Sequence, residues 1–154
     1  MKEKSLKREL GINFVAVTAA AIILTVLCVT AVFYRAFREE TLQSMSSCAH
    51  ALRDSGVFYD YKSFDFKAED GIRITLIDTD GTVLYDNFAD VSKMSNHASR
   101  PEVMAAFEKG EGSAVRQSET LDKATFYDAL RLEDGRVLRI AKETGSVFAI
   151  LKSS

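Results

Sequence analysis

The chain has 154 residues and a formal net charge of −2, with 47% apolar and 27% charged residues. This composition is that of a folded protein and excludes a disordered chain. The sequence contains no basic stripe, so we expect no nucleic-acid partner.

Residues 11–34 form the longest apolar segment, with 24 consecutive positions that carry no charge. An α-helix rises ~1.5 Å per residue, so this segment is long enough to cross a ~30 Å hydrocarbon core. We predict a cytoplasmic tail at 1–10 and a transmembrane helix at 11–34 in contact with membrane lipid. Four basic residues precede the helix, which by the positive-inside rule leaves the N-terminus in the cytoplasm and the rest of the chain outside.

A cleaved signal peptide is the alternative, because Val29-Thr30-Ala31 offers small residues for cleavage. The apolar segment is longer than the usual ~7–15-residue core of a signal peptide. The helical pattern also continues past the segment. We therefore favour an uncleaved anchor.

Residues 35–56 continue as a membrane-proximal helix. Met45, Cys48, Ala49 and Leu52 recur at i, i+3, i+4 and i+7, which predicts one buried stripe, and Gly56 marks the end. We expect a homodimer to form through this helix. The other cysteine, Cys28, would lie ~30 Å away, so the two cannot form a disulfide within one chain. A free buried thiol at Cys48 is favoured over an interchain disulfide.

Residues 57–145 are expected to form the extracytoplasmic domain. An aromatic-rich segment at 57–70 predicts a loop or short helix. Strands are predicted at 72–77, 83–85, 113–119, 125–132 and 137–142, and a helix opens at 99–102 with Ser99 and Glu102 at capping-box spacing. Asp80-Gly81 predicts a turn, and the polar segment 87–97 a long loop. The element order predicts an α+β fold, a five-stranded antiparallel sheet with helices on one face.

The chain contains the residue pattern Ile74-Thr75-Leu76-Ile77-Asp78-Thr79-Asp80-Gly81, followed by Asn96-His97-Ala98-Ser99-Arg100-Pro101-Glu102-Val103, of which the second segment is specific and Asp-x-Asp-Gly by itself is weak. It resembles the extracytoplasmic sensor region of phosphate-regulon-type (PhoR-like) sensor histidine kinases of Gram-positive bacteria. The resemblance covers roughly residues 73–143. It implies a protein of the bacterial plasma membrane with a PAS-like, single-Cache fold outside the membrane, between two membrane helices.

The resemblance also implies a parent protein with a second membrane span, a linker such as HAMP, and an ATP-dependent kinase core that autophosphorylates on histidine. The apolar residues at 146–154 would then approach the second span. From the residues alone, this segment fits equally well as a sixth strand or a docked C-terminal helix.

Candidate ligand-binding residues lie on the predicted strands and the long loop. Arg116 and Arg139 on strands suit bidentate binding of a carboxylate or phosphate, and a histidine in the loop suits a ligand contact or a pH sensor. The full candidate set is Tyr85, His97, Arg100, Arg116, Tyr127, Asp128 and Arg139.

Each candidate also has a structural interpretation, which we favour. Asn96 and His97 would tie the loop to the sheet, and Arg100 with Glu102 would serve local pairing and capping. The strand arginines would be solvated or ion-paired. Asp78, Asp80, Asp86 and Asp90 would be solvated turn carboxylates, because calcium loops need more ligands at defined spacing.

No Ser/His/Asp or Cys/His arrangement has a second indicator, so we predict no catalytic residue, no metal and no cofactor. The leading hypothesis is a sensory input module of a sensor kinase, whose stimulus is an unknown small ligand or an extracytoplasmic protein. The alternatives are a membrane-anchored binding or adaptor domain without kinase output, or the input of a chemoreceptor or cyclase.

Overall fold

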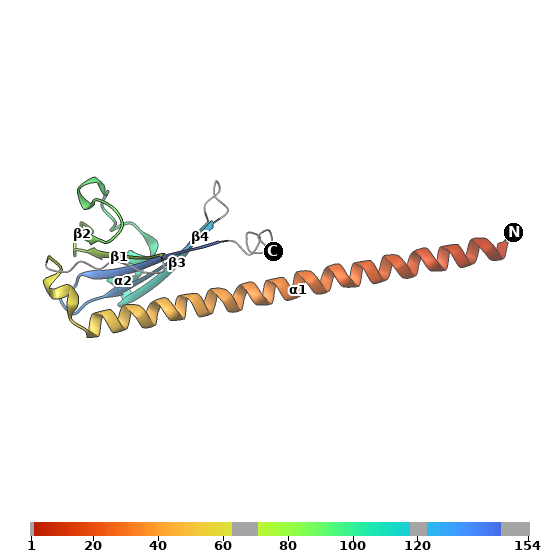
Figure 1. The fold of residues 1–154 in the computed structure, drawn as a ribbon, viewed down its shortest axis with the longest axis horizontal. Coiled ribbons are helices and arrows are strands. Elements are labelled where there is room, and N and C mark those ends of the chain that lie inside the picture. The colour runs from red at the N-terminus through yellow and green to blue at the C-terminus, as the bar shows by residue number, and fades with distance from the viewer. Residues whose placement is uncertain (1, 63–70, 118–122, 146–154) are drawn as a thin grey trace. The chain divides into compact units, whose positions relative to one another are not determined.

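The computed structural model describes residues 2–62, 71–117 and 123–145, and the chain divides into two compact units, residues 1–39 and 40–154. Parts of three predicted segments (63–70, 118–122 and 146–154) lie outside the described residues. Helix α1 (Lys2–Asp54) contributes to both units, and the five strands belong to the second (Figure 1).

The first unit is the apolar part of α1. Its most apolar window has a mean hydropathy of 2.6 and is fully exposed, so by length and composition the helix can cross a membrane. The hydroxyls of Thr18 and Thr25 donate to the carbonyls of Phe14 and Ala21, each at 2.8 Å. Both polar groups are therefore satisfied within the helix, as a lipid environment requires.

The second unit is built on one antiparallel sheet. Its strands are β1 (Ile72–Ile77), β2 (Val83–Asp86), β3 (Glu111–Gln117), β4 (Lys123–Arg131) and β5 (Val137–Gly145). The order across the sheet is β2-β1-β5-β4-β3, so the last strand lies between the first and the fourth. The predicted α+β class and the five-stranded antiparallel sheet are confirmed.

The C-terminal segment of α1 covers one face of the sheet, which we call the α1 face. Met45 and Ala49 pack there against Phe126, Leu130 and Ile140. The short 3-10 helix η1 (Val57–Asp60) extends this layer, because its Phe58 packs with apolar residues of β1 and β5. The stripe predicted from helical spacing is thus the stripe that packs on the sheet.

Helix α2 (Pro101–Lys109) covers the opposite face, the α2 face. Its Val103 and Ala106 pack against Ile77, Ala129 and Val137. Helices therefore lie on both faces of the sheet, where the sequence pattern had suggested one. The reason is strand alternation, since neighbouring residues of β5 point to opposite sides and both sides carry apolar residues.

The predicted capping box at the start of α2 is wrong. Arg100 is the N-cap residue, Pro101 occupies the first turn as expected, and no side chain caps the helix. Glu102 is fully buried and instead meets two arginines of the sheet. Gly110, with φ of 94°, ends the helix in the left-handed conformation.

The loop between β2 and α2, which contains the 3-10 helix η3 (Val91–Lys93), is fastened to the first hairpin. The Asn96 amide donates to the Asp80 carbonyl, and the His97 backbone N–H donates to the Gly81 carbonyl, both at 2.8 Å. Gly81 has φ of 87°, and a Cβ there would collide with Asn96 and Ala98. The predicted structural role of Asn96 and His97 is confirmed.

Candidate functional site

A cluster of charged side chains lies on the α2 face of the sheet, and we call it the arginine cluster. Its two carboxylates and one arginine are buried, and the other two arginines are partly exposed. It joins five elements, because β1, β3 and β5 each supply an arginine while β2 and α2 each supply a carboxylate. Its members are Arg73, Asp86, Glu102, Arg116 and Arg139.

Glu102 occupies the centre of one half of the cluster, and its side chain is fully buried. Arg116 forms an ion pair with one carboxylate oxygen, and Arg139 Nη1 lies 3.4 Å from the other. Both partners are needed, because a buried carboxylate is costly unless its charge and lone pairs are matched. This arrangement fixes the first turn of α2 on the sheet.

Asp86 is the carboxylate of the other half, and its side chain is also fully buried. Arg73 Nε donates to both oxygens at 3.1 and 2.9 Å, and the backbone N–H groups of Phe88 and Ala89 add two more donors. Burial works to raise the pKa of Asp86, but hydrogen bonds from Thr75, Arg73 and the two backbone groups hold it below its usual value. Asp86 therefore stays ionised.

Thr75 connects the two halves. Its hydroxyl accepts from Arg139 Nη2 at 3.2 Å and donates to Asp86 Oδ2 at 2.8 Å. Hydrogen bonds thus run without a break from α2 through β5 and β1 to β2. Hydrogen bonds that form such a chain polarise and strengthen one another.

Tyr127 of β4 places its ring against two of the arginines. The guanidinium carbons of Arg116 and Arg139 lie 4.1 and 5.4 Å from the ring centroid. The face of an aromatic ring attracts cations, and a desolvated pair gains more than an exposed one. Tyr127 therefore helps hold two positive charges close together.

Two buried polar atoms near this cluster have no hydrogen-bond partner among the described residues, Arg139 Nε and His97 Nδ1. Burial lowers the pKa of His97 to about 4, and the charges of Arg139, Arg100 and Arg73 act in the same direction. His97 is therefore neutral near pH 7 and does not sense pH there. Burial also lowers the pKa of Arg139.

A cavity of about 330 Å³ opens beside the arginine cluster on the same face. Arg73 and Tyr127 belong both to its wall and to the network, and the exposed Phe88 lies 6.0 Å below the Arg73 guanidinium. A guanidinium, two aromatic rings and a carboxylate suit a small polar molecule with an apolar part. The lining residues are Gly71, Arg73, Phe88, Thr125, Tyr127, Ala141 and Glu143.

The structure brings only some of the predicted candidates together. Arg116 and Arg139 belong to the arginine cluster, and Tyr127 packs against both. The charge of Arg139 also acts on His97. Arg100 caps α2. Tyr85 lies on the α1 face, where its ring meets Phe58 edge-on at 6.4 Å. Asp128 also lies on that face, so neither lines the cavity with Tyr127 as expected.

Sequence reasoning missed Arg73, Thr75 and Asp86, and it assigned Glu102 to capping. One signal was available, because Arg73 and Thr75 alternate with Ile72, Ile74 and Leu76 in a strand that is buried on both faces. Polar residues at inward positions of such a strand need partners. Asp86 was expected to be solvated like the turn aspartates. The sequence alone does not show that it faces Arg73.

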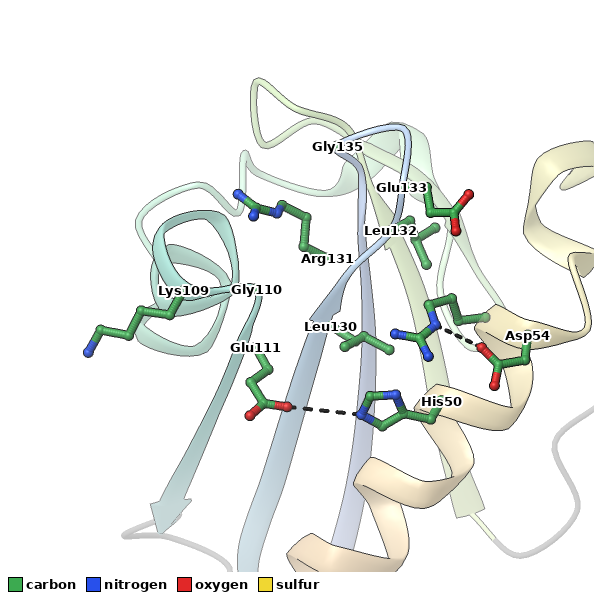
Figure 2. A pocket seen from close by; sticks show the side chains of 11 residues that line it. His50, Asp54, Lys109, Gly110, Glu111, Leu130, Arg131, Leu132, Glu133 and Gly135 are labelled. Atoms are coloured by element: carbon green, nitrogen blue, oxygen red, sulfur yellow. Dashed lines mark hydrogen bonds and ion pairs between the residues drawn. The ribbon is translucent and has the colours of Figure 1, made fainter.

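A second, wider hollow of about 810 Å³ lies by the C-terminal end of α1 (Figure 2). His50 of α1 faces Glu111 of β3 across it, and Arg53 and residues of the β4–β5 turn also line it. Charges of both signs line it, and Arg53 pairs with its neighbour Asp54 at 2.9 Å. Nothing in this hollow selects a ligand of one charge.

No family model and no curated protein matches the chain. Among solved structures, the crystal structure of "the extracellular domain of the putative histidine kinase" is similar with a TM-score of 0.39 and 17% identity. The similarity covers 66% of this chain and 40% of that chain, so the chain corresponds to less than half of that domain's length.

Proposed function

We propose that this chain is the extracytoplasmic input module of a membrane-bound sensor histidine kinase, with a PAS-like, single-Cache domain outside the bacterial plasma membrane. The N-terminus would lie in the cytoplasm and α1 would cross the bilayer. The kinase core would belong to the parent protein, because the motifs of this chain carry no catalytic chemistry.

One observation carries this proposal. A helix long and apolar enough to cross a membrane leads into a domain whose sheet has arginines around two buried carboxylates beside a cavity. A structural ion pair alone would not need three arginines around two carboxylates, with one Arg139 nitrogen that has no hydrogen-bond partner in the described part of the chain. The resemblance of residues 73–143 to PhoR-like sensor regions points in the same direction.

The cavity is the site at which a small ligand would act. Binding of the ligand against Arg73 would alter the hydrogen bonds that join Arg73, Asp86 and Thr75. Through Arg139, this change would reach Glu102 of α2. A rearrangement of this network needs only small displacements, which packed interfaces convert into discrete states.

A binding assay tests the site. Low-mass compounds are screened on the intact chain in nanodiscs by ligand-observed NMR. Phe88→Ala removes an 83% exposed ring from the cavity wall at little structural cost, and Tyr59→Ala is a matched control at an exposed ring outside the cavity. We expect a ligand whose signal is lost in Phe88→Ala and kept in Tyr59→Ala. A ligand that binds both variants equally well binds elsewhere.

A chimera tests the output. Residues 1–145 are joined to the second span and kinase core of a characterised sensor kinase, and autophosphorylation is followed in membranes. Reading the gene past the codon for Ser154 gives an independent answer. A second apolar span and a histidine-kinase core support the proposal, and a stop codon favours the anchored binding domain without kinase output.

The homodimer would form through the exposed face of the membrane-proximal part of α1. Ser47 is exposed on that part, whereas Ala49 is fully buried against the sheet. With the native cysteines replaced by serine, Ser47→Cys should cross-link between chains on oxidation and Ala49→Cys should not. Equal cross-linking at both positions would reject this dimer interface.

A further inference from the structure

Asp128 is a carboxylate placed among apolar side chains under α1. It alternates with Tyr127 and Ala129 of β4, so it shares the α1 face with Phe126 and Leu130, both of which pack against Met45 and Ala49 of α1. Only 9% of Asp128 is exposed. None of the described residues forms a hydrogen bond with its carboxylate.

The charged groups that face Asp128 come from two elements. His50 approaches from α1 and Glu111 from β3, and both act on the titration of Asp128. The residues directly opposite in the sheet, Ser113 of β3 and Ile140 of β5, carry no charge. Lys142 lies on the same face of β5, two residues beyond Ile140.

His50 and Glu111 also face one another. Figure 2 shows the imidazole of His50 directed from α1 toward the Glu111 carboxylate on β3, with Nε2 4.0 Å from Oε2. This is an ion pair only when the imidazole is protonated.

We propose that Asp128, His50 and Glu111 form an acid-responsive clasp that holds the C-terminal segment of α1 on the sheet more tightly in acid than at neutral pH. This device lies on the face opposite the cavity. It goes beyond the proposed function, because it names protons as an input that acts on the helix itself.

The charge of Asp128 explains the direction. In acid Asp128 is neutral, so its side chain places no buried charge beneath α1. Above its raised pKa of about 6, Asp128 is ionised, and Glu111 acts on it as a like charge. A buried carboxylate then lies beside a like charge beneath α1, which disfavours the closed packing.

Burial raises the pKa of Asp128 to about 6, and Glu111 adds to the rise while His50 opposes it. The rise from 3.8 to about 6 corresponds to a factor of about 100 between the two charge states. This factor is the upper limit for the change in the local opening equilibrium of α1. The change is smaller if local opening of α1 exposes Asp128 to solvent only in part.

Amide hydrogen exchange on the intact chain in nanodiscs tests the clasp. Wild type and Asp128→Asn are compared at pH 5 and at pH 7.5, always at equal pH, so that the intrinsic exchange rates cancel. Peptides covering residues 42–54 report on α1. Peptides covering α2, on the opposite face, are the internal control.

At pH 7.5 we expect residues 42–54 to exchange about 10- to 100-fold faster in wild type than in Asp128→Asn, with no difference at pH 5. The α2 peptides should not differ at either pH. Glu133→Gln, which removes an exposed carboxylate from the β4–β5 turn, should behave as wild type.

Three results would overturn the clasp. The first is equal exchange of wild type and Asp128→Asn at pH 7.5. The second is an equal change in α1 and α2, which indicates a global loss of stability. The third is a Glu111→Gln variant, altered at an exposed site and so expected to fold, whose α1 exchange at pH 7.5 equals that of wild type rather than being slower.

Discussion

The stability of the second unit should depend on pH through two buried groups that act in opposite directions. His97 has a pKa of about 4 in the folded chain, against about 6.5 for an unperturbed histidine. The unfolded chain therefore binds more protons between these values, and the free energy of unfolding rises with pH through this window. A shift of this size corresponds to about 3 kcal/mol.

The contribution of Asp128 to the pH dependence of stability has the opposite sign. Its pKa of about 6 lies above the unperturbed 3.8, so the folded chain binds more protons between pH 4 and 6. Stability from this group is fully present in acid and falls as pH rises, also by about 3 kcal/mol. Because the two pH windows overlap, we expect the free energy of unfolding of the wild type to stay constant between pH 4 and 6, to within about 1 kcal/mol.

Single substitutions should separate the two contributions. His97→Gln removes the contribution that increases with pH, so the free energy of unfolding of this variant should fall with pH by about 3 kcal/mol. The free energy of unfolding of Asp128→Asn should rise with pH by a similar amount. The free energy of unfolding of the double variant should again be nearly independent of pH in this range. Urea unfolding of the intact chain, followed by tyrosine fluorescence at five pH values, measures all four profiles. Four of the five tyrosines lie in the second unit, so the signal reports on its unfolding.

Flat profiles for both single variants would show that neither group has the environment described. A wild type that gains several kcal/mol between pH 4 and 6 would show that His97 acts without the opposing effect of Asp128. In either case the compensation argument is refuted.

Three further substitutions test the packing on the α2 face by urea unfolding. Glu102→Gln leaves two arginines without a carboxylate and should cost about 3 kcal/mol, whereas the exposed Glu108→Gln on the same helix should change stability by less than about 0.5 kcal/mol. Gly112→Ala should cost about 1–3 kcal/mol, because its Cβ would lie 2.5 Å from that of Ala105; an unchanged midpoint would mean that α2 has room to move. Thr75→Val keeps the shape but removes one hydrogen bond to Asp86 and the acceptor of Arg139 Nη2, so a loss below about 1 kcal/mol would contradict the network.

The sequence alone determined most of the fold. The membrane-length helix, the stripe at Met45 and Ala49, the five strands and the Asp80-Gly81 turn all follow from local periodicity and turn chemistry. These signals are local, because each depends on residues within one or two turns or on strand alternation. The fold class could therefore be predicted without knowledge of the three-dimensional arrangement.

Only the tertiary structure decided which side chains meet. Glu102 carries a helix-start pattern, yet it is buried against Arg116 and Arg139, which lie 14 and 37 residues further along the chain. Tyr127 and Asp128 are neighbours in sequence and face opposite layers of the molecule. Register and strand order set these pairings, and both arise from contacts between distant segments, for which local periodicity contains no information.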